Sequence, residues 1–166
     1  DAGGRQPAEW LMSDLLTDSA IAELLAERKP AISVPDLVPR KVRDRHVEAH
    51  HEFVGNDGSR FRLTVRQLLL DPLDFSVVLM FSVPGTSRQF RLRRCNGDSH
   101  LHTNKIERNV IDGFHIHTAT ERYQAAGFKE DDFAEPTDAY AELFGAIRHM
   151  LRTASFDAES QEEMPI

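Results

Sequence analysis

Residues 60–94 read RFRLTVRQLLLDPLDFSVVLMFSVPGTSRQFRLRR, and their pattern predicts the centre of the fold. The two ends of this stretch, residues 60–66 and 88–93, alternate basic and apolar side chains with the period of two that is typical of half-buried strands. Residues 74–83 between them are mostly apolar and predict a buried strand, which ends at the turn-forming pair Pro84-Gly85. The stretch therefore predicts three antiparallel strands of a meander.

Two more strands flank this stretch. Residues 47–54 lead into Asp57-Gly58, a dipeptide typical of a tight hairpin, so they predict a strand paired with residues 60–66. Residues 114–118 alternate again and predict the last strand, whereas the Asn and Gly residues within 96–113 predict a loop. The sequence thus predicts an antiparallel meander of about five strands.

A helix is expected on each side of the meander. In residues 9–29 the apolar side chains recur at helical spacing, and Pro30 ends the run. Thr137 is the expected cap of a second helix, because apolar residues with the spacing of a buried helical stripe follow it. These residues are Tyr140, Leu143, Phe144, Ile147 and Leu151. The predicted fold class is therefore α+β, with N-terminal and C-terminal helices flanking the strands.

The chain is expected to hold one domain with a short segment on either side. Residues 1–11 are expected to be a flexible lead, from an expression vector or an upstream start, because Met12-Ser13-Asp14 looks like a natural start of translation. Residues 12–153 are expected to form a single α+β domain, and residues 154–166 an acidic, frayed tail.

Length and composition are those of an ordinary globular protein. The chain has 166 residues, 40 % of them hydrophobic and 28 % charged, which is enough for one domain with a real core. No apolar run approaches the ~20 residues of a membrane span, and no signal-peptide pattern is visible. Cys95 is the single cysteine, so an internal disulfide is excluded and a reducing compartment is indicated. We therefore expect a soluble, cytoplasmic protein with no membrane partner.

Charge is unevenly spread along the chain. The net charge of −7 divides into −4 over residues 1–39, +5 over residues 40–129 and −8 over residues 130–166. The basic middle favours RNA or DNA as a partner, whereas the acidic ends favour a basic protein partner. The chain has no Walker loop, no Gly-x-Gly-x-x-Gly run and no Gly-x-Ser-x-Gly elbow. Nucleotide hydrolysis, dinucleotide redox chemistry and serine hydrolysis are therefore disfavoured.

Strand parity places polar side chains together on one face of the sheet. The arginines of residues 60–66 and 91–93 should share this face with His115 and His117, opposite the apolar side chains. Such a face is either a solvated outer surface or a phosphate-binding surface, since guanidinium groups match phosphate oxygens. The residues predicted to bind nucleic acid are Arg60, Arg62, Arg91, Arg93 and Lys105.

The first functional hypothesis is therefore a nucleic-acid-binding, RNA-cleaving protein that needs no cofactor. Its catalytic residues are His115 and His117, assisted by His102 and Glu121. One group acts as the base and its partner as the acid, while the arginines stabilise the developing charge.

The histidines also support a second hypothesis, a metal-binding protein that carries out metal-assisted hydrolysis. His100-Leu101-His102 and His115-Ile116-His117 are two His-x-His pairs, and residues i and i+2 of a strand project to the same side. On adjacent strands, His100, His102, His115 and His117 could surround zinc or another divalent transition metal. A third hypothesis is a non-catalytic interaction module, such as an antitoxin or inhibitor, that binds a protein through its acidic termini. The oligomeric state is left open.

His102-Thr103-Asn104 followed by Phe114-His115-Ile116-His117 resembles a motif of short, uncharacterised bacterial proteins that share a domain of unknown function. The resemblance covers roughly residues 59–153 and implies a strand meander, a His-Thr-Asn loop, a His-x-His strand and a final helix. Those proteins have Pro-Asp-Gly after the loop motif, where this chain has Lys105-Ile106-Glu107. The resemblance implies no defined activity, and it favours a role in a bacterial toxin–antitoxin or defence system.

Overall fold

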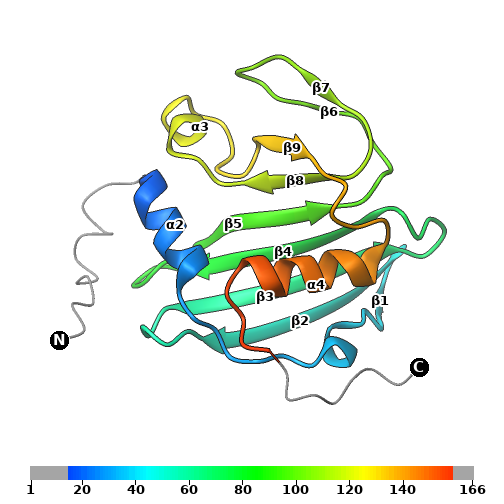
Figure 1. Ribbon diagram of the computed structural model, residues 1–166, viewed down its shortest axis with the longest axis horizontal. Helices are drawn as coiled ribbons and strands as arrows, with labels where there is room; N and C mark the ends of the chain where they lie inside the picture. Colours follow the sequence, from blue (N-terminus) through cyan, green and yellow to red (C-terminus); the bar gives the residue numbers. More distant parts are fainter. Residues whose placement is uncertain (1–14, 159–166) are drawn as a thin grey trace.

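The computed structural model describes residues 15–158, whose centre is a seven-stranded antiparallel sheet (Figure 1). The strands in spatial order are β1 (Lys41–Arg43), β2 (His46–Val54), β3 (Arg60–Leu68), β4 (Phe75–Ser82), β5 (Gln89–Asn96), β8 (His115–Thr118) and β9 (Ala134–Pro136). A small second sheet pairs β6 (His102–Thr103) with β7 (Val110–Ile111). The predicted α+β class and meander are confirmed, and the short strands β1 and β9 extend the meander at its two edges.

Helices flank the strands, as predicted. They are α2 (Asp18–Ala26), the 3₁₀ helix η1 (Val34–Leu37), α3 (Glu121–Ala125) and α4 (Leu143–Thr153). The Thr17 side chain caps α2 by accepting a hydrogen bond from the backbone N–H of Ala20, at 3.0 Å. Residues 9–14 of the predicted first helix lie outside the described residues. Within residues 15–158, no helix is long and apolar enough to cross a membrane.

The start of α4 differs from the prediction. Glu142, and not Thr137, is its N-cap: the carboxylate accepts hydrogen bonds from the backbone N–H groups of Phe144 and Gly145. Thr137 instead accepts from the backbone N–H of Ala139 in the preceding loop. A carboxylate at a helix N-terminus is also favoured by the helix dipole, so the later start is physically reasonable.

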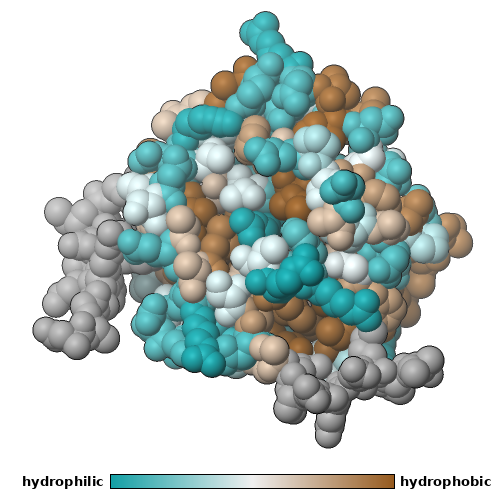
Figure 2. All heavy atoms as spheres, viewed as in Figure 1, coloured by the Kyte–Doolittle hydropathy of each residue, from teal (hydrophilic) through white to brown (hydrophobic). Residues whose placement is uncertain are grey.

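The core lies between one face of the sheet and the two longer helices. Helices α2 and α4 lie over the same side of the sheet (Figure 1). The main apolar side chains of this inner face are Phe61, Leu63, Val65, Val77, Leu79, Phe81, Phe90 and Leu92. They pack in one cluster with Leu24 of α2 and Ile147 and Met150 of α4. The outward side of α4 is polar, and Figure 2 shows polar side chains interspersed with apolar ones over this side of the molecule.

Lys29 ties the ends of the two helices together. Its side chain is fully buried, and Nζ donates to the carbonyl oxygens of Leu24 at 2.8 Å, Glu27 at 2.8 Å and Ala154 at 2.6 Å. These carbonyls lie at or beside the C-terminal ends of α2 and α4, where a positive charge is favoured. The ammonium also lies 4.8 Å from the centre of the Phe61 ring.

A β-bulge reverses the predicted parity at the end of β5. The register of β4 and β5 shifts between Leu79 and Met80, so that Leu79 pairs with Arg93 and Met80 with Arg91. Arg93 consequently faces the helix side, where its Nη1 lies 3.4 Å from the carbonyl oxygen of Thr153. Arg94 takes the place on the outer face that the alternation predicted for Arg93.

Candidate functional site

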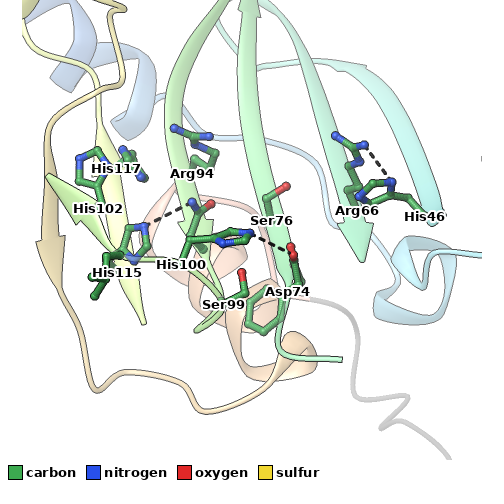
Figure 3. A pocket seen from close by; sticks show the side chains of 14 residues that line it. His46, Arg66, Asp74, Ser76, Arg94, Ser99, His100, His102, His115 and His117 are labelled. Atoms are coloured by element: carbon green, nitrogen blue, oxygen red, sulfur yellow. Dashed lines mark hydrogen bonds and ion pairs between the residues drawn. The ribbon is translucent and has the colours of Figure 1, made fainter. Parts of the chain in front are cut away.

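A row of polar side chains crosses four neighbouring strands on the outer face of the sheet. Arg66 on β3 pairs in register with Ser76 on β4, Ser76 with Asn96 on β5, and Asn96 with His115 on β8. Register partners point to the same face of a sheet, so the four side chains stand side by side. They line a pocket of about 260 Å³, which His117 and Arg94 also line from the next row (Figure 3).

Three histidines form a cluster at one side of this pocket. His102 of β6 lies against His115 and His117 of β8 (Figure 3). The ring centres are 4.6 Å apart for His102 and His117, 5.0 Å for His115 and His117, and 5.6 Å for His102 and His115. His115 and His117 are both buried, at 4 % and 2 % exposure.

Asn104 holds His102 in this position. Its side chain is buried, donates to the carbonyl oxygen of Ala134 at 2.9 Å and accepts from the Ala134 backbone N–H at 2.9 Å. The loop that follows β6 is thereby fastened to β9, which itself pairs with β8. The His-Thr-Asn loop therefore carries His102 back over the His-x-His strand.

Hydrogen bonds fix which nitrogen of each ring carries the proton. His115 Nδ1 is 2.8 Å from the carbonyl oxygen of Gly113, and His117 Nδ1 is 2.7 Å from that of Asp131. His102 Nε2 is 3.1 Å from Asn104 Oδ1, which is the acceptor end of that amide because it also accepts from Ala134. Each of these ring nitrogens must donate, so the lone pairs lie on His115 Nε2, His117 Nε2 and His102 Nδ1. The His115 Nε2 lone pair faces the Asn96 side-chain amide, which lies 3.4 Å away and is the donor of that contact.

The surroundings keep the two buried rings neutral. Burial, together with the charges of Arg94 and the other two rings, lowers the pKa of His117 to about 2. Burial is also the main cause that lowers the pKa of His115, with His102 and Arg94 adding to it. Neutral imidazoles with a free lone pair are the form in which histidine binds metals.

Asp131 connects the cluster to a positive charge. Its carboxylate is fully buried, with Oδ2 3.3 Å from Arg94 Nε and Oδ1 3.3 Å from Arg91 Nε. Burial raises the pKa of Asp131, while the two guanidinium groups oppose that shift. The same residue accepts the hydrogen bond from His117 through its backbone, so it positions both His117 and Arg94.

The opposite rim of the pocket carries a second set of polar pairs. His100 Nε2 lies 3.4 Å from Asp74 Oδ2, and its side chain is 80 % exposed. Arg66 contacts His46 Nδ1 through Nη2 at 3.0 Å, and its Nε lies 3.6 Å from Glu48 Oε1 (Figure 3). Of the four histidines predicted as metal ligands, the structure therefore brings together His102, His115 and His117 and places His100 with Asp74.

The other predicted site residues lie outside the pocket. Glu121 is in the first turn of α3, where its backbone N–H donates to Asp18, and Lys105 pairs with Asp132 at 2.8 Å. Arg60, Arg62 and Arg91 share the outer face, but Arg93 does not, because of the bulge in β5. Arg91 is ion-paired with Glu130 and Asp131.

Four residues of the site were not predicted from the sequence: Arg94, Asn96, Ser76 and Asp131. Strict alternation places Arg94 on the inner face, so it was not predicted to belong to the site. The third basic residue in the run Arg91-Leu92-Arg93-Arg94 was the one signal that the alternation of inner and outer side chains could shift. Asn96 lies in the stretch that was predicted as a loop, and Ser76 lies in the predicted buried strand, for which no register with its neighbours was predicted. Asp131 reaches the pocket from a segment predicted as loop, and no local signal marks it.

Within residues 15–158, no group of three or more His, Cys, Asp or Glu side chains is already arranged to hold a metal ion. Metal binding to the three-histidine cluster therefore requires the rings to adjust. No family model, no curated protein and no solved structure matches the chain, so the resemblance to the His-Thr-Asn proteins stays a prediction.

Proposed function

We propose that the protein is a metal-dependent hydrolase in which His102, His115 and His117 bind one zinc ion or another divalent transition metal. The observation that carries this proposal is the way each ring is held. One nitrogen of every ring donates to a fixed oxygen, so the other nitrogen carries the lone pair. On His115 that lone pair faces the Asn96 side-chain amide at 3.4 Å, a long contact that an ion would replace. Metal-binding histidines are almost always oriented by such a second hydrogen bond.

The spacing of the rings supports a shared ion. With metal–nitrogen distances of about 2.0–2.1 Å, two imidazole ring centres around a tetrahedral ion are about 5 Å apart. The three observed separations run from 4.6 to 5.6 Å. The separations therefore fit one ion held between the three rings. Aiming the lone pairs at one point requires the rings to turn, because the planes of His102 and His115 lie only 16° from parallel.

Three histidine ligands leave one coordination position open, which is typical of catalytic zinc sites. In this chain the cluster borders the pocket, so water and a substrate can reach that position. A bound divalent ion lowers the pKa of a water ligand to about 7, which provides a nucleophile for hydrolysis at neutral pH.

A metal-free acid–base mechanism has less support. It needs one protonated imidazole as the acid, whereas burial and Arg94 lower the pKa values of both His115 and His117. Glu121, the other group predicted to assist, is on α3 and does not line the pocket. The toxin–antitoxin role, the cytoplasmic location and the protein partner remain predictions.

The test is the metal content of tag-free protein after zinc loading and gel filtration, measured by elemental and native mass spectrometry. We expect about one zinc per chain in the wild type, loss of this zinc in His102→Ala, and its retention in His100→Ala. His100→Ala is the matched control because both residues lie on the pocket, two positions apart in the sequence. Absence of stoichiometric zinc in the wild type, or equal loss in both variants, would contradict the proposal.

A further inference from the structure

Several side-chain groups that line the pocket can donate hydrogen bonds and have no acceptor within the part of the chain that the structure describes. Among the described residues, the two terminal nitrogens of Arg94 and the hydroxyl of Ser76 make no hydrogen bond, although both residues line the pocket. Arg66 uses Nη2 for His46 and has Nε near Glu48, which leaves Nη1 available. Donors that face a solvent-filled pocket are available to a ligand that brings acceptor oxygens.

The two arginines are placed to act on one ligand. Both point to the outer face, from strands separated by β4, and Arg94 is one row further along the sheet than Arg66. Strand spacing puts their backbones on the order of 12 Å apart, with Ser76 and Asn96 between them. Each guanidinium group has a carboxylate near its Nε, Asp131 for Arg94 and Glu48 for Arg66, which limits its freedom before a ligand arrives.

We infer that the substrate is a phosphate ester whose phosphate group is bound by Arg94, Arg66 and Ser76 beside the three-histidine cluster. Two guanidinium groups and a hydroxyl match a group with three or four oxygens and up to two charges better than a carboxylate, which has two oxygens. Hydrolysis then breaks the ester P–O bond: water supplies hydroxide to phosphorus and a proton to the departing alcohol. The catalytic step rests on the proposed metal centre, whereas phosphate binding by the arginines does not.

The pocket favours a single phosphate group over a broad nucleic-acid surface. A broad surface would use Arg60, Arg62 and Arg91, but none of them lines the pocket. Glu52 pairs in register with Arg62, and Arg91 is held by two carboxylates, so acidic groups lie beside the arginines on this face. The volume of about 260 Å³ suits one phosphate with part of a nucleoside, which is the chemistry shared by a free nucleotide and by the end of an RNA strand.

The test is isothermal titration of metal-free protein, in chelator, with inorganic phosphate, AMP and a short 5′-phosphorylated RNA. We expect Arg94→Gln and Arg66→Gln each to weaken phosphate binding by about tenfold or more, because each removes a hydrogen bond between charged groups. Arg62→Gln is the matched control, on the same strand and face as Arg66 but outside the pocket, and should bind as the wild type does. Arg94→Lys, which keeps the charge, should recover part of the loss, and thermal unfolding verifies that every variant is folded.

Each outcome has a defined meaning. Selective loss in the two pocket variants supports the inference, and the ligand that binds more tightly, AMP or the RNA, identifies the source of the phosphate. Absence of phosphate binding to the wild type overturns the inference, as does equal weakening in Arg62→Gln. Because the titration is made without metal, these failures are separate from failure of the metal centre, which the zinc measurement on His102→Ala detects.

Discussion

The two faces of the sheet are stabilised in different ways. On the inner face, side chains such as Leu63 and Leu79 are fully buried, and their contribution grows with the apolar area removed from water. Over the outer face, His117 of β8 and the loop residues Asn104 and Asp131 are buried as well, but they depend on hydrogen bonds and ion pairs of defined geometry. The inner face therefore supplies most of the apolar burial that drives folding, whereas the outer face carries the polar groups to which we assign binding.

The largest expected effect comes from the inner face. Leu63→Ala removes a fully buried side chain from the centre of β3 and should lower the free energy of unfolding by about 2–5 kcal/mol. Thr64→Ala, the next residue on the opposite face, is the control and should cost about 1 kcal/mol or less. Urea unfolding of both variants checks this difference, and equal losses would remove the distinction between the faces.

Asn104→Ala should separate folding from metal binding on the outer face. The change removes the contacts that fasten the loop after β6 to Ala134 and the acceptor that orients His102. We expect zinc affinity to fall about tenfold to a hundredfold, as for other partners of metal-binding histidines. Competition with a coloured chelator measures the affinity. Asn109→Ala, which removes only the exposed partner of Asn104, should bind zinc almost normally.

Low pH should destabilise the metal-free protein, because His117 takes up a proton in the unfolded chain that it does not take up in the folded one. Burial lowers the pKa of His117 in the folded state from 6.5 to about 2, so the unfolded chain binds more protons as the pH falls below 6.5. Stability is therefore full above pH 6.5 and declines below it, with about 2 kcal/mol lost from this group between pH 7.5 and pH 5. Urea unfolding in chelator across this range checks the slope. It should be shallower in His117→Asn and unchanged in His100→Ala, and an unaltered slope in His117→Asn would contradict the assignment.

The smallest expected effect tests the bulge in β5. Arg93→Gln alters a side chain on the helix side of the sheet, so it should leave phosphate and zinc binding unchanged and cost about 1 kcal/mol of stability or less. Arg94→Gln, one residue along, should weaken phosphate binding. Phosphate titration of Arg93→Gln and Arg94→Gln measures this difference. Loss of phosphate binding in Arg93→Gln would show that the two residues share one face.

Apolar periodicity predicted the inner face well, because the alternation in residues 60–66 and 88–92 reflects burial against the helices. The same alternation failed at Arg93, since a bulge depends on how two strands pair and not on either strand alone. It also gave no position for His102, whose placement over β8 depends on the bonds from Asn104 to Ala134, thirty residues away. The sequence thus yielded the residue types of the site and the strand that carries two of its histidines, while the assembly of the site required the long-range contacts.

Whether His102, His115 and His117 share one metal ion can be measured by X-ray absorption at the zinc edge. For zinc-loaded protein we expect one zinc per chain with three imidazole nitrogens at about 2.0–2.1 Å and one oxygen ligand. A first shell of oxygens with one imidazole or none would contradict it.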